Sequence, residues 1–204
     1  MNNQKTIIKW YLWRFTPIHL WHEDIINNAI QSLSKNVDNP YENLFIWLGS
    51  INRSQSMKYF FNEEERIKFI KMLYPNIKIL WIPDVRDKAS EEENNKIRLN
   101  NLDKIINNEF PQTDKEVIFY WGSYEDVEFF EKDNRKIQYM NRYDGTTTKV
   151  SATEVRDALI QIILSESNNT IREQRLYDKS IVNKIIVPDL LNLFEYKWNE
   201  FKKK

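Results

Sequence analysis

The sequence has 204 residues, a length that suits one ordinary α/β domain with a short C-terminal extension. With 41% hydrophobic residues it can bury a core, and it is too apolar to be intrinsically disordered. Thirty basic and thirty acidic residues cancel, which argues against a nucleic-acid-binding protein, and the lack of cysteine excludes disulfides and thiolate metal sites. Lys9 and Arg14 interrupt the first apolar run, so it predicts neither a signal peptide nor a membrane span. We therefore expect a cytoplasmic enzyme that binds neither nucleic acid nor membrane, and the composition is compatible with a homo-oligomer.

The first predicted strand, residues 7–13, leads into a segment that holds both histidines of the sequence. Residues 13–22 are WRFTPIHLWH, and a helix with apolar residues at helical spacing is predicted over 22–33. The free N–H groups and the dipole of a helix N-terminus attract phosphate. Arg14, His19 and His22 would add charged donors there. These residues predict a phosphate site. A metal site is the weaker alternative, because the two histidines have no third ligand beside them.

Two further apolar runs, residues 44–48 and 117–121, end in the same dipeptide, Gly49-Ser50 and Gly122-Ser123. Ligands of open α/β sheets bind beyond the carboxyl ends of the strands, and glycine lets a ligand approach the backbone. Either glycine alone could simply form a tight turn. Together they predict a ligand site at this edge of the sheet.

The other strand and helix patterns complete an alternating α/β order. A helix is predicted over 62–73, a strand over 77–82 and a helix over 91–106. Strands that alternate with helices predict a parallel sheet with helices on both faces and right-handed crossovers.

The last part of the sequence is predicted to be helical. Ser151 and Glu154 form a capping box that starts a helix, and Thr153 and Arg156 in its first turns would place a second anion site there. A further helix begins at Pro188. We expect one α/β domain over residues 1–165 and a helical extension over 166–204 packed on it.

The two phosphate motifs together resemble the nucleotidyltransferase superfamily. They are the Arg-Phe-x-Pro-x-His-x-x-His segment and the Ser-x-Thr-x-x-Arg segment (residues 151–156), the counterparts of the family's HxGH and ISxTxxR motifs. The stretches LGSINRS (48–54) and FNEEER (61–66) are similar to archaeal-type and bacterial nicotinamide mononucleotide (NMN) adenylyltransferases. The resemblance spans roughly residues 7–159 and implies a Rossmann-like nucleotidyltransferase fold.

The resemblance also implies an activity, the transfer of AMP from ATP to NMN, which gives NAD and pyrophosphate. The catalytic residues would be His19, His22 and Arg156. ATP would be bound by Arg14, Phe15, Gly122, Ser151, Thr153 and Arg156, and the acceptor by Gly49, Ser50, Asp84, Trp81 and Trp121. No protein ligand for a metal is expected, because Mg²⁺ would be held mainly by the ATP phosphates and water.

The chain departs from the family in two respects. Trp13 and Trp21 stand where the family usually has glycine, and residues 85–108 lack the aromatic on which the family commonly stacks nicotinamide. An indole at a strand end, from Trp81 or Trp121, could replace that aromatic, although both are equally consistent with core residues. The alternatives are adenylyl or cytidylyl transfer to another acceptor, such as phosphopantetheine or a sugar or polyol phosphate, and a nucleotide sensor without turnover. The presence of His19 and His22 with the complete 151–156 motif favours an enzyme.

Overall fold

The computed structural model describes residues 6–49, 56–81, 85, 90–111, 114–121, 130, 133–140, 145 and 147–203. The chain divides into two compact units. The first contains Met1–Arg14, Asn28–Arg53 and Ile77–Asn141, and the second contains Phe15–Asn27, Ser54–Asn76 and Arg142–Lys204. No helix in the described ranges combines the length and the apolar character needed to cross a membrane.

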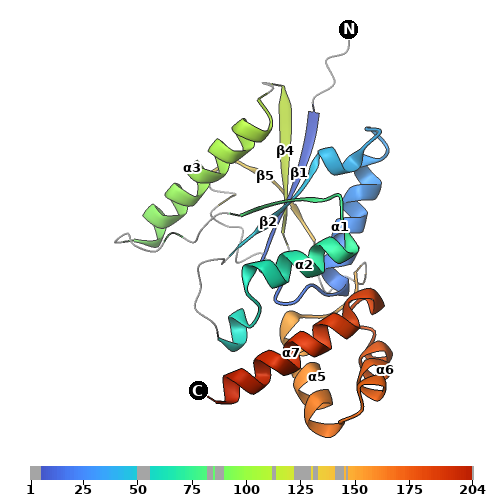
Figure 1. Cartoon of the computed structure of the whole chain (residues 1–204). Coiled ribbons are helices and arrows are strands. Elements are labelled where there is room, and N and C mark those ends of the chain that lie inside the picture. The colour runs from blue at the N-terminus through green and yellow to red at the C-terminus, as the bar shows by residue number, and fades with distance from the viewer. Residues whose placement is uncertain are drawn as a thin grey trace. The chain divides into compact units, whose positions relative to one another are not determined.

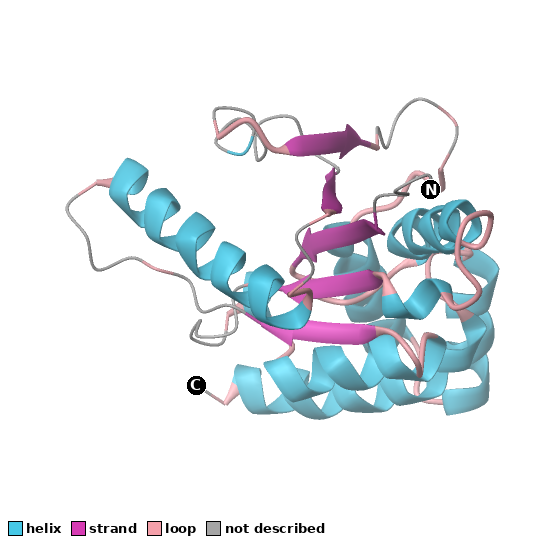
Figure 2. Cartoon of the chain, turned by 90° about the horizontal axis from the view of Figure 1, so that it is seen from above, coloured by secondary structure: helices cyan, strands magenta, loops and turns pink. Residues whose placement is uncertain are grey.

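The first unit contains a five-stranded parallel sheet with the strands in the order β3-β2-β1-β4-β5 (Figure 1). The strands are β1 (Thr6–Trp13), β2 (Leu44–Leu48), β3 (Lys78–Trp81), β4 (Lys115–Trp121) and β5 (Lys136–Tyr139). Figure 2 shows them side by side. The strand order reverses between β1 and β4, and open α/β sheets bind ligands beyond the carboxyl ends at such a reversal. The predicted α/β class with a parallel sheet is confirmed.

One face of this sheet packs against α3 (Glu91–Glu109). Side chains alternate between the faces of a strand, which places Trp10, Trp47, Phe119 and Trp121 together on the face toward α3. The apolar residues of α3 that meet them recur at helical spacing and are Leu99, Leu102 and Ile106. The aromatic runs that predict strands therefore also supply the core of the first unit.

The second unit is helical. It contains α2 (Glu63–Leu73), α5 (Ala152–Ser165), α6 (Asn169–Lys179) and α7 (Val187–Lys202), with the short 3₁₀ helices η2 (Met57–Tyr59) and η3 (Lys184–Ile186). Helix α1 (Leu20–Leu33) begins in this unit and ends in the first, where η1 (Pro40–Glu42) follows it. The predicted capping box at Ser151–Glu154 of α5 is present, and a second capping box, at Asn62–Glu65, starts α2.

Helix α7 is held by a part-buried ion pair to α2 and by a ring contact to Phe60, just before α2. The Nζ of Lys197 donates to both carboxylate oxygens of Glu65, at 2.9 and 2.6 Å. The ring of Phe194 stacks on that of Phe60 with 4.5 Å between centroids. Because Glu65 also accepts the backbone N–H of Asn62 in the capping box, the same carboxylate fixes the start of α2 and the position of α7.

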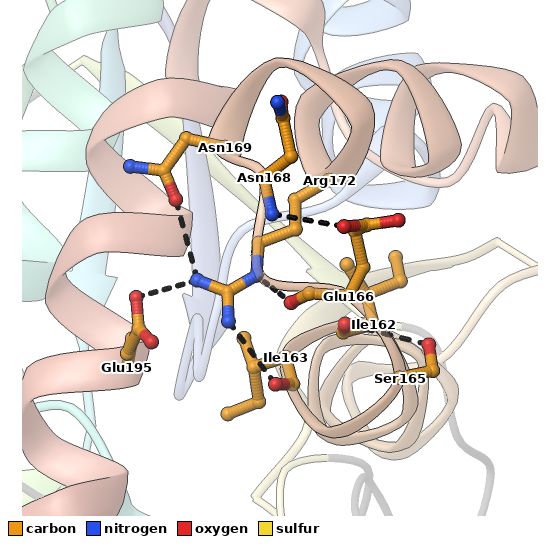
Figure 3. Close-up of polar contacts among 8 residues, drawn as sticks. All are labelled: Ile162, Ile163, Ser165, Glu166, Asn168, Asn169, Arg172 and Glu195. Atoms are coloured by element: carbon orange, nitrogen blue, oxygen red, sulfur yellow. Dashed lines mark hydrogen bonds and ion pairs between the residues drawn. The ribbon is translucent and has the colours of Figure 1, made fainter.

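A second buried cation, Arg172, joins α5, α6 and α7 (Figure 3). Its guanidinium donates to the carbonyl oxygens of Glu166 at 2.5 Å and Ile163 at 3.1 Å, just where the last carbonyls of α5 lack helical partners. It also donates to the carboxylate of Glu195 on α7 at 2.7 Å. Arg172 therefore caps the end of one helix while binding another.

This arrangement predicts that Arg172→Ala lowers the free energy of unfolding by about 2–3 kcal/mol, since it leaves buried carbonyl oxygens without donors. Arg175→Ala is the matched control, because Arg175 lies one turn further along α6 and its side chain is 48% exposed. We expect that control to cost less than about 1 kcal/mol. Urea denaturation of the two variants measures the difference, and equal losses would contradict the assignment of Arg172.

Candidate functional site

The turn between β1 and α1 carries the two histidines and an unusual backbone conformation. Phe15 is buried and has φ 49°, in the left-handed region that favours glycine. A cis peptide bond joins Thr16 to Pro17. A non-glycine residue held in this region costs about 1–3 kcal/mol, and such residues cluster at functional sites. The ring of Phe15 contacts that of His22, with 4.6 Å between centroids, so the turn is fixed against the second histidine.

The two imidazoles lie against each other and are both buried. Their centroids are 3.9 Å apart, and the backbone N–H of His19 donates to Nδ1 of His22 at 3.3 Å. Because Nδ1 accepts, the proton of a neutral His22 resides on Nε2. Trp21, between the histidines, is also buried and contacts the His22 ring at 5.4 Å. His22 is therefore oriented as a donor through Nε2, and the bulky Trp21 is accommodated within the packing of this turn.

The start of α5 reaches the histidine turn through Arg156. Ser151 caps the helix by accepting the N–H of Glu154 at 3.2 Å. One turn later, the guanidinium of Arg156 donates to the carbonyl oxygen of Thr16 at 2.6 Å and to the hydroxyl of Thr153 at 3.1 Å. Thr16 follows Phe15, which contacts His22, so the two motifs predicted from the sequence lie together in the second unit.

The charge of Arg156 is poorly compensated. Its residue surface is 9% exposed, and no carboxylate in the described ranges lies within ion-pair distance of its guanidinium. Two other largely buried arginines differ, since Arg172 pairs with Glu195 and Arg135 pairs with Asp103 at 2.8 Å. Burial lowers the pKa of Arg156, yet a guanidinium does not lose its proton in proteins. A buried cation with neutral partners is an arrangement that a bound anion would stabilise.

Two acidic residues that directly follow His22 make long-range contacts that the sequence does not predict. The carboxylate of Glu23 accepts from the side-chain amide of Asn183 at 2.8 Å, and that of Asp24 accepts the backbone N–H of Thr148 at 2.5 Å. Burial raises the pKa of Glu23, as does the charge of Asp24, and the hydrogen bond from Asn183 opposes them. In the sequence, Glu23 and Asp24 indicate only an acidic helix start, because the neighbouring residues give no sign of partners more than 120 residues away.

The predicted site residues of the first unit lie at its strand ends. Arg14 is exposed beyond β1, and Gly49 is half-buried beyond β2. Trp121 at the end of β4 is 6% exposed and its ring lies 4.9 Å from that of Phe130, whereas Trp81 at the end of β3 is 52% exposed. Ser50, Asp84 and Gly122 lie outside the described residues.

A metal site built from protein ligands alone is not found in the part of the chain that the structure describes, where no group of three His, Cys, Asp or Glu residues could hold an ion. The candidate donors around Arg156 are cations, imidazoles and hydroxyls, a set that suits phosphate oxygens. A surface hollow of about 390 Å³ between α5 and α6 involves none of the predicted residues and is lined by Gln161, Ile162, Ser165, Arg175, Asp178 and Lys179.

No protein-family model matches the sequence, and no curated protein shows significant similarity to it. Solved structures are similar in fold. A bifunctional NMN adenylyltransferase/ADP ribose pyrophosphatase from Francisella tularensis is 15% identical with a TM-score of 0.61, and the match covers 98% of this chain and 54% of that one. A NadR protein in complex with NAD and AMP-PNP is 19% identical with a TM-score of 0.56, and the match covers 83% and 46%.

The chain spans about half the length of these structures. The likeness confirms the predicted Rossmann-like α/β fold, which the chain shares with structures described as NMN adenylyltransferases.

The raised pKa of Glu23 predicts a pH-dependent effect of Glu23→Gln on stability. Below the ordinary carboxyl pKa of 4.5, Glu23 is protonated whether the chain is folded or unfolded. As the pH rises, the unfolded chain releases this proton first, so the folded parent loses stability until Glu23 also ionises. The free energy of unfolding of Glu23→Gln should therefore rise relative to the parent between pH 4.5 and neutral pH.

Denaturation of both proteins across this pH range is the measurement. A difference that does not change with pH would contradict the assigned pKa direction.

Proposed function

We propose that the chain is an adenylyltransferase that transfers the AMP moiety of ATP to NMN and releases pyrophosphate. The observation that carries the proposal is the buried Arg156, whose hydrogen-bond partners in the described ranges are neutral oxygens and which lies beside the histidine turn. Two helix N-termini, of α1 and α5, belong to the same unit and supply further donors for phosphate. The fold likeness to structures described as NMN adenylyltransferases supports the choice of reaction.

The proposed reaction needs no covalent intermediate. A phosphate oxygen of the acceptor attacks the α-phosphorus of ATP in line, a new P–O–P bond forms, and the bond to the β-phosphate oxygen breaks as pyrophosphate leaves. Catalysis then depends on positioning and on stabilising charge. His22, with its proton on Nε2, would donate to the α- and β-phosphate oxygens together with His19. Arg156 would grip the phosphate chain with Ser151 and Thr153, and Arg14 would add a further cation.

Mg²⁺ is proposed as the accompanying ion. It would supply charge neutralisation of the phosphates, which would themselves be its main ligands. A solved structure of the F. tularensis protein, similar to this chain with a TM-score of 0.59, contains AMP and a manganese ion, which supports a divalent ion in the proposed reaction.

The choice of NMN as acceptor rests on an exposed aromatic ring of the first unit, the indole of Trp81. Trp81 presents a half-exposed indole at the carboxyl end of β3, the end of a parallel strand at which ligands bind. The cationic nicotinamide ring of NMN would stack on it, with Gly49, Ser50, Asp84 and Trp121 as further predicted acceptor residues. The direct test is to mix the protein with ATP, Mg²⁺ and NMN and follow pyrophosphate release. Pyrophosphate release with another phosphorylated acceptor but not with NMN would overturn the choice of NMN as acceptor. Nucleotide binding without any pyrophosphate release would favour a sensor.

His22→Ala should lower kcat by about 10²–10³, since a donor to developing charge in a preorganised site is lost. The affinity for ATP should change far less, because the remaining donors still bind the ground state. Pyrophosphate release at saturating ATP measures kcat, and equilibrium dialysis measures ATP affinity. Equal kcat in variant and parent would contradict the assigned role.

Arg156→Ala should raise the KM for ATP as well as lower kcat, because the buried charge acts on bound ATP throughout the reaction. Arg156→Lys should recover only part of the loss, since an ammonium group lacks the planar fork of the guanidinium. Kinetics over a range of ATP concentrations separate the two constants. Full recovery by lysine would show that charge alone suffices.

Trp81→Leu should weaken NMN binding about 2- to 30-fold, the range expected for losing 0.5–2 kcal/mol of cation–π interaction. Trp121→Leu tests the other predicted acceptor indole, which is buried against Phe130, so its loss should act mainly on stability. NMN affinity is measured with ATP binding as the check on folding. An unchanged affinity in Trp81→Leu would reject the stacking role.

A further inference from the structure

Asp24 is an unexpected residue at the proposed phosphate site. It lies two residues after His22 in the first turns of α1, where a negative charge stabilises the helix but would repel a bound triphosphate. An acidic residue at this position therefore suggests a structural role, which its contacts in the second unit should show. The relevant contact is the hydrogen bond of Asp24 to a segment 124 residues away in the sequence.

The carboxylate of Asp24 accepts the backbone N–H of Thr148 at 2.5 Å, and Asp24 is half-buried. Thr148 lies three residues before Ser151, the N-cap of α5, and its own carbonyl accepts the N–H of Val150 at 3.0 Å. Val150 is buried, which leaves this short connection little freedom. Asp24 therefore holds the segment that leads directly into the start of α5.

Arg156 joins the same two segments from the other direction, because its guanidinium donates to the carbonyl of Thr16. In the proposed function this guanidinium also binds phosphate, so its bond to Thr16 is one that a ligand can alter. The bond from Thr148 to Asp24 involves no group proposed to contact the nucleotide. It can hold the spacing of the two motifs while Arg156 changes partners.

We propose that Asp24 is a positioning residue that sets the distance between the histidine turn and the N-terminus of α5, so that one phosphate chain contacts both. The inference rests on the proposed function of this site. In this role the carboxylate oxygen of Asp24 is needed as a hydrogen-bond acceptor, whereas its negative charge opposes the binding of phosphate. An asparagine at position 24 would keep the acceptor and remove the charge.

The test compares Asp24→Asn with Asp24→Ala. Hydrogen exchange of the Thr148 amide reports the hydrogen bond without any ligand, and ATP affinity reports its consequence. Asp24→Ala should lose protection at Thr148 and bind ATP about tenfold more weakly at unchanged stoichiometry. Asp24→Asn should keep the protection and bind ATP at least as tightly as the parent.

Asp178→Ala is the control, since Asp178 is an exposed carboxylate on α6 that accepts one hydrogen bond, from Gln174 at 2.7 Å. It should leave ATP affinity unchanged. A merely structural role of Asp24 would lower the fraction of protein that binds ATP and leave the dissociation constant of the remainder as in the parent, which overturns the inference. Equal behaviour of Asp24→Asn and Asp24→Ala also overturns it.

The failure of the proposed function has a different signature. If the parent binds no ATP, the nucleotide site is wrong and Asp24 has no phosphate chain to position, whatever the Thr148 amide shows. If the parent binds ATP and Asp24→Ala binds it equally well after losing protection at Thr148, the site stands and the positioning role alone is rejected.

Discussion

The buried guanidinium of Arg156, bonded to the carbonyl of Thr16, is the interaction on which the candidate site depends. It joins the start of α5 to the histidine turn, and its hydrogen-bond partners in the described residues are the neutral oxygens of Thr16 and Thr153. The contrast with Lys9 is instructive. Lys9 is also buried, its ammonium lies 5.1 Å from the centre of the Tyr120 ring, and burial lowers its pKa. The guanidinium of Arg156 keeps its proton when buried, and its hydrogen bonds to neutral oxygens favour an anionic ligand.

The other strong interactions of the second unit hold this charge in place. The capping box at Ser151 fixes the N-terminus of α5, and Arg172 satisfies the carbonyls at its C-terminal end. Glu195 on α7 binds Arg172, and Lys197 on the same helix binds Glu65 at the start of α2. The helical extension therefore fixes the C-terminal end of the helix that carries Arg156, and that helix's own capping box fixes its start. These ion pairs join helices of the unit, whereas Arg156, for which we propose a ligand, has neutral hydrogen-bond partners in the part of the chain that the structure describes.

The sequence predicted the sheet and the helix start at Ser151 because both are local patterns. Buried parallel strands are continuous apolar runs, as in Leu44–Leu48, and capping boxes such as Ser151–Glu154 are defined within four residues. Strand β5 was not predicted because it is a short edge strand of Lys136-Ile-Gln-Tyr with mostly exposed side chains. The roles of Glu23 and Asp24 were not predicted either, since each depends on a partner that only the fold brings close. The hydrogen bond from Arg156 to the Thr16 carbonyl could not be predicted, because every residue has a backbone carbonyl and the sequence does not show which one accepts.

The central claim is that Arg156 is a cation kept for a phosphate ligand, and the stability of Arg156→Met with and without ATP tests it most directly. The matched variant is Arg172→Met, which removes a buried guanidinium that already has a carboxylate partner. Without ligand, Arg156→Met should be destabilised by at least about 1 kcal/mol less than Arg172→Met. ATP at 100 times its dissociation constant should add about 2.7 kcal/mol to the parent and to Arg172→Met, and almost nothing to Arg156→Met. Equal stabilisation of all three proteins by ATP would contradict the account.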